Sequence, residues 1–167
     1  MSRTASIIQQ KIISLQDAQI LCAQWKANGE KIVFTNGVFD ILHAGHVQSL
    51  MAASECGTRL IIGLNADVSV KRLKGDSRPI IQQKDRALLL AALFFVDAIV
   101  LFEEDTPINL ISTLLPDVLV KSADYALHNI VGAKEVIAHG GVVRIMPMVE
   151  GLSTTKIVDK IMKGIDN

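Results

Sequence analysis

Apolar and polar positions alternate along the chain in blocks typical of strands and helices that follow one another. Short runs rich in Val, Ile and Leu predict five strands, over residues 31–35, 60–64, 98–102, 118–121 and 142–145. Apolar residues between these runs recur at helical spacing, and they predict helices over about 44–57 and 84–95, one beginning at Thr106-Pro107, one ending near Gly140-Gly141 and a last one beginning at Ser153. This alternation predicts βαβ units. We therefore expect a single Rossmann-like α/β domain with a five-stranded parallel sheet and helices on both faces.

The N-terminal part has a helical pattern of its own. Ser14 and Asp17 are spaced as in a capping box, and the apolar positions that follow form a stripe up to Gly29. We interpret residues 1–28 as an N-terminal helical segment packed on a main domain over residues 29–167.

Composition narrows the class of protein. The chain has 167 residues, half of them apolar, and a mean hydropathy of +0.37. Charges or glycines nevertheless interrupt every apolar run before the roughly 18 residues that a membrane span needs. Met1-Ser2-Arg3-Thr4 lacks the apolar core of a secretion signal, and Cys22 and Cys56 form no CxxC pair. We expect a cytoplasmic protein with reduced thiols and no membrane partner.

The overall charge gives no sign of a polyanionic partner. Seventeen basic residues balance seventeen acidic ones, so we predict no binding to nucleic acid or anionic membranes. Any anion that the protein binds must be held by a local group of residues.

The segment that most constrains function is Thr35-Asn36-Gly37-Val38-Phe39-Asp40-Ile41-Leu42-His43-Ala44-Gly45-His46, between a predicted strand and a predicted helix. Ligands bind at the carboxyl ends of parallel strands, and a helix N-terminus favours a phosphate. Gly37 permits a tight turn, and Gly45 permits close approach of backbone or ligand. His43 and His46, three residues apart, are expected on one helical face, directed at the same anion. A metal pair is the alternative, but no third ligand is near in the sequence, so we predict no protein-held metal.

Two further segments suit phosphates. Lys71-Arg72-Leu73-Lys74-Gly75-Asp76-Ser77-Arg78-Pro79 is interpreted as a flexible cationic loop of the kind that folds over phosphate charge, with a solvated surface loop as the alternative. Gly151-Leu152-Ser153-Thr154-Thr155 places more hydroxyls at a helix start than a cap needs. The acidic run Glu103-Glu104-Asp105 is interpreted as offsetting a helix dipole and not as a metal site.

Together these segments resemble the HxGH nucleotidyltransferase superfamily, and within it most closely the adenylyltransferases for D-glycero-β-D-manno-heptose 1-phosphate, which occur alone or fused to a kinase domain. The resemblance covers about residues 16–162 and includes TNGVFDILHAGH, KRLKGDSRP, FEEDTP, LVKSADY and GLSTT. It implies a nucleotidyltransferase domain over residues 29–167, with His43, His46 and Lys74 as catalytic residues. The implied nucleotide-binding residues are Thr35, Asn36, Gly37, Phe39, Asp40, Gly45, Lys121, Asp124, Gly151, Ser153, Thr154 and Thr155. The residues expected to bind the sugar phosphate are Asn65, Asp67, Arg72 and Arg78, although Asn65 and Asp67 could equally be turn residues.

The chain departs from the family pattern at two places. Ser122 and Ala123 replace two glycines of a loop that usually reads KGGDY, which leaves the exact substrate open. Met148 stands where the cytidylyltransferases usually have an arginine, which weakens a cytidylyl interpretation. Arg86 matches a family arginine, and it is expected either to reach the site or to brace a subunit contact.

The implied reaction needs no general base, because a sugar phosphate is largely a dianion at neutral pH. We expect this phosphate to attack the α-phosphorus of ATP directly, with Mg²⁺ bound through the ATP phosphates. The expected partners are ATP and a sugar phosphate, and a homodimer is kept as a hypothesis. Two alternatives remain open: a cytidylyltransferase acting on glycerol 3-phosphate or another polyol phosphate, and a non-catalytic nucleotide-binding module.

Overall fold

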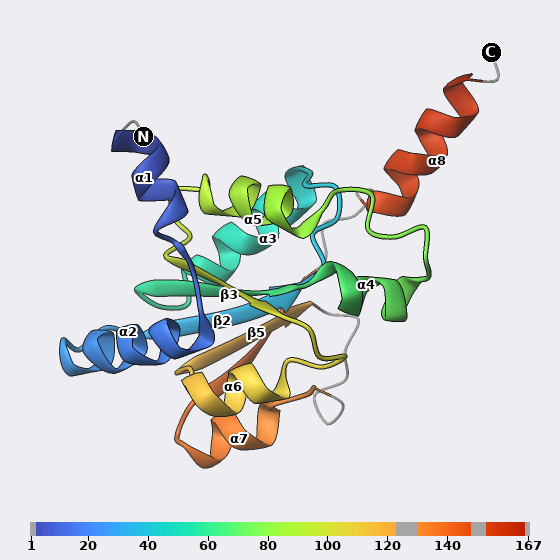
Figure 1. Cartoon of the computed structure of the whole chain (residues 1–167). Coiled ribbons are helices and arrows are strands. Elements are labelled where there is room, and N and C mark those ends of the chain that lie inside the picture. Colours follow the sequence, from blue (N-terminus) through green and yellow to red (C-terminus); the bar gives the residue numbers. More distant parts are fainter. Residues whose placement is uncertain (1–2, 123–129, 148–152, 166–167) are drawn as a thin grey trace.

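The computed structural model describes residues 3–122, 130–147 and 153–165, and in these ranges its core is a parallel sheet of six strands (Figure 1). The strands are β1 (Ile12–Ile13), β2 (Ile32–Gly37), β3 (Arg59–Asn65), β4 (Ala98–Phe102), β5 (Val118–Ser122) and β6 (Val142–Met146). Their order in the sheet is β1-β4-β3-β2-β5-β6, and every neighbouring pair is parallel. The Rossmann-like α/β class predicted from the sequence is therefore confirmed.

The prediction of five strands is wrong by one, because β1 also joins the sheet. Ile12 pairs with Ile99 and Ile13 with Val100 of β4, and the amide of Ile99 donates to the carbonyl of Lys11 at 2.8 Å. Two residues are too few to show a strand pattern of their own, so only the pairing with β4 defines this strand. The division of the chain at residue 28 stays a prediction. β1 lies in the N-terminal segment, but it pairs with β4 of the main domain.

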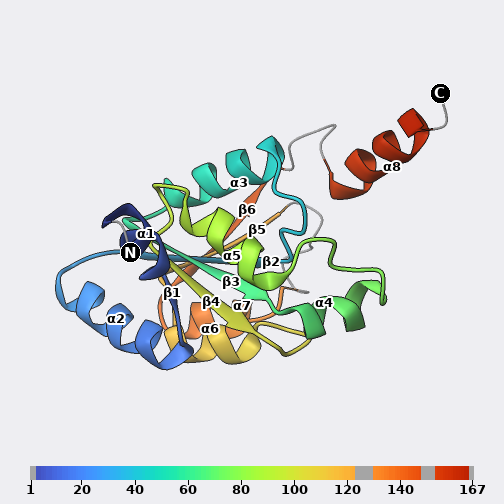
Figure 2. The ribbon, with the colours of Figure 1, turned by 45° about the horizontal axis from the view of Figure 1, so that its top comes forward.

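Helices cover both faces of the sheet. The described helices are α1 (Arg3–Gln9), α2 (Leu15–Ala27), α3 (Ala44–Ser54), α4 (Asp67–Lys74), α5 (Gln83–Ala91), α6 (Ile108–Leu114), α7 (Ala133–Ala138) and α8 (Thr154–Ile165). Figures 1 and 2 show α1, α3 and α5 on one face, α2, α6 and α7 on the other, and α8 extending away from the sheet. Ser14 caps α2 by accepting the amide of Asp17 at 3.1 Å, as predicted. None of the described helices is long and apolar enough to cross a membrane.

Alternate strand residues build two cores, one on each face. Phe34, Ile61 and Val100 pack with α2, α6 and α7, whereas Val33, Ile62 and Ile99 pack with α3 and α5. Since both faces are buried, almost every position of the central strands is apolar, which explains the uninterrupted Val and Ile runs. Each large side chain buried in this way contributes about 1.5–3 kcal/mol.

The topology fixes where a ligand can bind. The chain moves outward from β2 to β3 and β4, and then returns to place β5 on the other side of β2. The order of the strands therefore reverses between β2 and β5, and the crevice beyond the carboxyl ends of these two strands is the expected ligand site in such a sheet.

Candidate active site

His43 and His46 lie at the N-terminus of α3, directly beyond β2. His43 is the N-cap residue, with an extended backbone (φ −139°, ψ 169°), and its side chain caps nothing. Its ring stacks on that of His46, with centroids 3.8 Å apart and planes at 20°. The Nδ1 atoms of both rings are buried and have no hydrogen-bond partner in the described ranges. The spacing of three residues thus places both rings on one face, as predicted, and it leaves polar atoms for a ligand.

Phe39 packs against this pair. Its backbone is in the left-handed region (φ 48°), and its ring meets His46 edge-on, with centroids 5.2 Å apart. A Cβ added at Gly37 would lie 2.9 Å from Cε2 of Phe39, so the missing side chain makes room for the ring. Gly45 is buried in the first turn of α3. Gly37 and Phe39 therefore shape the surroundings of His46, and their contact with a nucleotide stays a prediction.

The two imidazoles are electrically neutral at neutral pH before any ligand binds. Burial lowers the pKa of His43 below its ordinary 6.5. Burial also lowers the pKa of His46 to about 4, helped by repulsion from His43, when that ring is protonated, and from Lys74, and opposed by a hydrogen bond with the backbone of Ile41. The fixed positive charge near the histidines therefore comes from the basic segment and from the N-terminus of α3.

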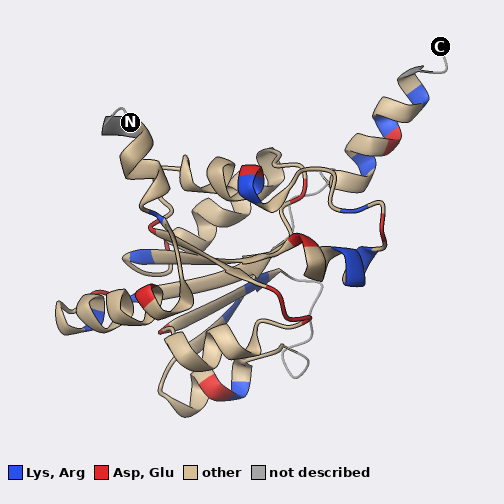
Figure 3. Cartoon of the chain, viewed as in Figure 1, with Lys and Arg blue, Asp and Glu red and all other residues tan. Residues whose placement is uncertain are grey.

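The basic segment is half helix and half loop, which corrects its interpretation as a flexible loop throughout. Its first part, up to Lys74, is the last turn of α4, which ends at Gly75 (φ 93°). Figure 3 shows basic residues gathered on this turn. Lys74 is exposed, and its charge influences His46, so it belongs to the surroundings of the histidine pair.

Asp40 ties the second part of the basic segment to the histidine loop. Its buried carboxylate accepts from Nη1 of Arg78 at 2.7 Å and from the amides of Ile80 and Ile81 at 2.7 and 3.0 Å. Although burial raises the pKa of Asp40, these hydrogen bonds and the Arg78 charge bring it below its ordinary value. Asp40 therefore stays ionised and holds Arg78 beside the site.

Lys121 and Asn36 face each other across the point where the strand order reverses. Asn36 lies near the carboxyl end of β2 and Lys121 near that of β5. The ammonium of Lys121 donates to the amide oxygen of Asn36. Thr35 precedes Asn36 and is half-buried. These three predicted nucleotide-binding residues thus lie at the expected crevice, while their ligand contacts stay predictions.

Other predicted residues have different surroundings. Arg72 turns toward the segment between β4 and α6, where it pairs with Asp105 at 2.8 Å and donates to the carbonyl of Glu103. Ser153 caps α8 by accepting the amide of Lys156 at 3.2 Å, and Thr154 and Thr155 begin that helix. Asp124, Gly151, Ala123 and Met148 lie outside the described residues.

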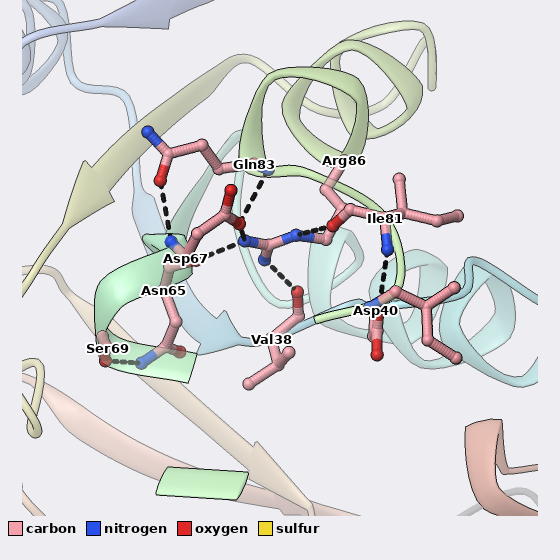
Figure 4. A network of polar contacts seen from close by, with 9 residues as sticks. Val38, Asp40, Asn65, Asp67, Ser69, Ile81, Gln83 and Arg86 are labelled. Carbon is pink, nitrogen blue, oxygen red and sulfur yellow. Dashed lines mark hydrogen bonds and ion pairs between the residues drawn. The ribbon is translucent and has the colours of Figure 1, made fainter. Parts of the chain in front are cut away.

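Asn65 and Asp67 belong to a polar network centred on Arg86 (Figure 4). Asn65 is buried and donates to Ser69 at 3.0 Å, and Asp67 pairs with Arg86 at 2.7 Å. The side chain of Arg86 is fully buried, so it does not reach an open site directly, and the expectation that it braces a subunit contact stays a prediction. Whether Asn65 or Asp67 also contacts a substrate stays a prediction.

Gln83 is a member of this network that the sequence did not reveal. Its side-chain oxygen accepts a hydrogen bond from the backbone N–H of Asp67 at 2.7 Å, and its backbone N–H donates to the Asp67 carboxylate at 2.8 Å. Each residue is the first of its helix, α4 or α5, so the two helix starts cap each other. A glutamine at a helix start carries no distinctive sequence signal.

A cavity of about 610 Å³ opens beside β4, and neither His43 nor His46 is among the residues that line it. It is lined by Leu15, Arg72, Leu101, Phe102, Glu103, Glu104, Asn109 and Leu110. Its polar groups are bonded to one another or to close neighbours, since Arg72 pairs with Asp105 and Glu104 accepts from Asn109 at 3.3 Å. Among the residues described, no three His, Cys, Asp or Glu side chains are grouped so that they could hold a metal ion.

The chain is similar in sequence to known proteins. The chain is 48% identical over 159 residues to the bifunctional protein HldE of Koribacter versatilis, an alignment that covers 95% of this chain and 33% of that protein. It is 54% identical over 151 residues to HldE of Magnetococcus marinus, which covers 90% of this chain and 31% of that protein. The chain thus spans about a third of the length of these curated relatives.

Solved structures share the fold. A lipopolysaccharide core biosynthesis protein from Thermoplasma volcanium matches with a TM-score of 0.59 and 27% identity, over 72% of this chain and 98% of that one. Pantoate-beta-alanine ligase from Francisella tularensis, complexed with beta-gamma ATP and beta-alanine, matches with a TM-score of 0.60 over 93% of this chain and 79% of that one, but at 15% identity it shows the fold alone. A model of the cytidylyltransferase-like family matches residues 34–160. This span includes the histidine pair, the basic segment and the start of α8, and the chain therefore belongs to the cytidylyltransferase-like family.

Proposed function

We propose that the chain transfers AMP from ATP to D-glycero-β-D-manno-heptose 1-phosphate, which gives ADP-heptose for lipopolysaccharide or another envelope polysaccharide, and pyrophosphate. The observation that carries this proposal is the stacked pair His43 and His46 at the start of α3, next to the point where the strand order reverses. The resemblance of the surrounding segments to heptose 1-phosphate adenylyltransferases, and about 50% identity to the HldE proteins, support the choice of nucleotide and acceptor.

In the proposed reaction an oxygen of the sugar phosphate attacks the α-phosphorus of ATP. The bond between that phosphorus and the oxygen bridging to the β-phosphate breaks, and pyrophosphate leaves with the electron pair. Because the nucleophile is already a dianion, the chain needs to supply positioning and positive charge and not a base. His43 and His46 would bind oxygens of the α-phosphate and the bridge, and Lys74 and Arg78 would attract the charge of the triphosphate.

The neutral state of His46 before binding is compatible with this role. A negative charge about 4 Å from the ring, at an effective dielectric constant of about 20, favours the protonated form by about 4 kcal/mol. That energy is enough to bring the pKa of His46 from about 4 to near neutrality. ATP binding would therefore be accompanied by proton uptake, so that positive charge appears at the histidine pair only when the polyphosphate is present.

Mg²⁺ is proposed as the metal that accompanies ATP and shields its phosphate charges. Its ligands would be phosphate oxygens and water, which Mg²⁺ commonly retains, since the described residues offer no grouped set of protein ligands. A cytoplasmic location and a homodimer remain part of the proposal, and sedimentation of the purified chain would test the latter.

A panel of nucleotides and acceptors tests the proposed function. ATP and CTP are each combined with heptose 1-phosphate and with glycerol 3-phosphate, and released pyrophosphate is measured. We expect release with ATP and heptose 1-phosphate, and loss of release in His46→Ala but not in His139→Ala, since His139 is exposed after α7. Turnover of CTP with glycerol 3-phosphate would instead show a cytidylyltransferase, and ATP binding without release from any acceptor would show a binding module.

A further inference from the structure

Arg86 places a fully buried charge at the edge of the sheet where the proposed site lies. The buried polar residues of the described ranges are Asp40, which follows β2, Asn65, which ends β3, and Ser69 and Arg86, which lie in the next two helices, α4 and α5. Burial of a charged side chain is costly, and well-packed apolar residues often replace buried ion pairs without loss of stability. The positioning of neighbouring groups therefore explains the presence of this buried network better than a gain in stability does.

The guanidinium of Arg86 joins segments that are distant in sequence (Figure 4). Nη1 donates to the carbonyl of Val38 at 2.5 Å, and Nη2 to the carbonyl of Asn65 at 2.9 Å. Nε donates to the carbonyl of Ile81 at 2.9 Å, and the remaining partner is the carboxylate of Asp67. One side chain thus holds the ends of β2 and β3 and the segment before α5 together.

These bonds act on both sides of Phe39. Val38, which precedes it, is held by Arg86, and Asp40, which follows it, is held by the amides of Ile80 and Ile81. Ile81 connects the two contacts, because its amide donates to Asp40 while its carbonyl accepts from Arg86. Phe39 is therefore fixed from both sides in a left-handed conformation that a non-glycine residue rarely adopts. In this conformation its ring packs edge-on against His46.

We propose that Arg86 is a positioning residue, which fixes the peptides on either side of Phe39 and thereby holds the Phe39 ring against His46 and keeps the two histidines stacked. Its effect on catalysis rests on the proposed function, whereas its effect on the histidine rings does not. Lysine is a poor substitute, because a single ammonium cannot replace the planar fork of donors that reaches four separated acceptors.

Arg86→Lys tests this proposal, and Arg59→Lys is its matched control. Arg59 also joins separate strands by ion pairs, to Glu30 at 2.7 Å and to Asp97 at 3.0 Å, but it does so at the amino ends of β2, β3 and β4. The histidine ring signals of ligand-free protein are recorded by NMR, and kcat and KM are measured on folded enzyme. We expect Arg86→Lys to shift the signals of His43 and His46 but not of His139, and to lower kcat by about 10–100-fold with KM for ATP little changed, since small misplacements of reacting groups cost rates of this order. Arg59→Lys should change neither.

Two results would overturn the proposal: ring signals of His43 and His46 in Arg86→Lys that coincide with those of the parent, or equal shifts in both lysine variants. If Arg86→Lys does not fold, Asp67→Asn keeps the guanidinium and removes its charged partner, so it should shift the same signals by less, and unchanged signals would be equally decisive against the proposal. Absence of pyrophosphate release from the parent would contradict the proposed function, while the ligand-free ring signals would still decide the role of Arg86.

Discussion

The low pKa of His46 makes the stability of the fold sensitive to acid. The imidazole titrates at about 4 in the folded protein and near 6.5 when the chain is unfolded, so the unfolded state takes up a proton first as the pH falls. Its contribution to stability is therefore fully present above pH 6.5, and it is lost progressively as the pH falls toward 4. We predict that His46→Asn, which cannot titrate, loses less stability on acidification than the parent.

The magnitude follows from the difference between the two pKa values. At about 1.4 kcal/mol per pH unit, the shift from 6.5 to about 4 corresponds to at most about 3.5 kcal/mol. The His46 side chain is only partly buried, so solvent screening reduces this to an expected difference of about 1–2 kcal/mol. Carboxylates such as Asp40, whose pKa is also lowered, titrate in both proteins and cancel in the comparison.

Urea unfolding at pH 7.5 and pH 4.5 measures this difference. The free energy of unfolding of the parent should fall by about 1–2 kcal/mol more than that of His46→Asn between the two pH values. His139→Asn, which changes an exposed ring, serves as the control and should behave as the parent does. An equal loss in the parent and in His46→Asn would refute the inference that partial burial keeps His46 neutral in the folded protein.

Further predictions concern catalysis, metal, packing and thiol reactivity. His46→Ala should lower kcat by about 10²-fold or more while its circular dichroism spectrum stays the same as that of the parent. Turnover equal to that of the parent would contradict a catalytic role for His46. A chelator should abolish pyrophosphate release, and Mg²⁺ should restore it, without a change in the melting temperature of the ATP-free protein; release that survives chelation would exclude a metal requirement. Gly132→Ala should destabilise by at least about 2 kcal/mol in urea unfolding, because φ is 84° and the added Cβ would lie 2.5 Å from Ile111; parental stability would contradict this. Burial raises the pKa of Cys22 to about 11, so a thiol reagent at pH 8 should leave this residue unmodified until the chain unfolds, and rapid labelling of Cys22 in the native protein would disagree.

Most of the sheet could be predicted because each central strand carries its own signal. Strands buried on both faces, such as β2, β3 and β4, must be apolar, and the five predicted runs correspond to β2 to β6, although β6 is largely exposed. The strand β1 has no such signal, because its two residues become a strand only by pairing with β4. Its detection requires knowledge of the neighbouring edge of the sheet, which no local pattern contains.

Helix α4 was missed for a different reason. Its charged residues suggested a flexible cationic loop, whereas Asp67 in the first turn, basic residues in the last turn and Gly75 after it are the usual signs of a helix. The sequence therefore contained the signal, and the high charge of the segment obscured it.

The histidine pair could be predicted because its geometry is local. Two residues three apart at the start of a helix share a face whatever the rest of the chain does. The partners of the charged residues are not local: Arg72 finds Asp105, Arg78 finds Asp40, and Arg86 finds carbonyl groups of three segments. Such pairings depend on which loops meet at the edge of the sheet, so the sequence could not assign them.

The most direct test of the proposed site is a crystal structure with Mg²⁺ and an ATP analogue whose bond between the α- and β-phosphates cannot be cleaved. We predict that the α-phosphate lies against His43 and His46 at the start of α3, with the polyphosphate near Lys74 and Arg78. A polyphosphate bound elsewhere, for example in the cavity beside β4, would contradict the assignment of the histidine pair as the place where AMP is transferred.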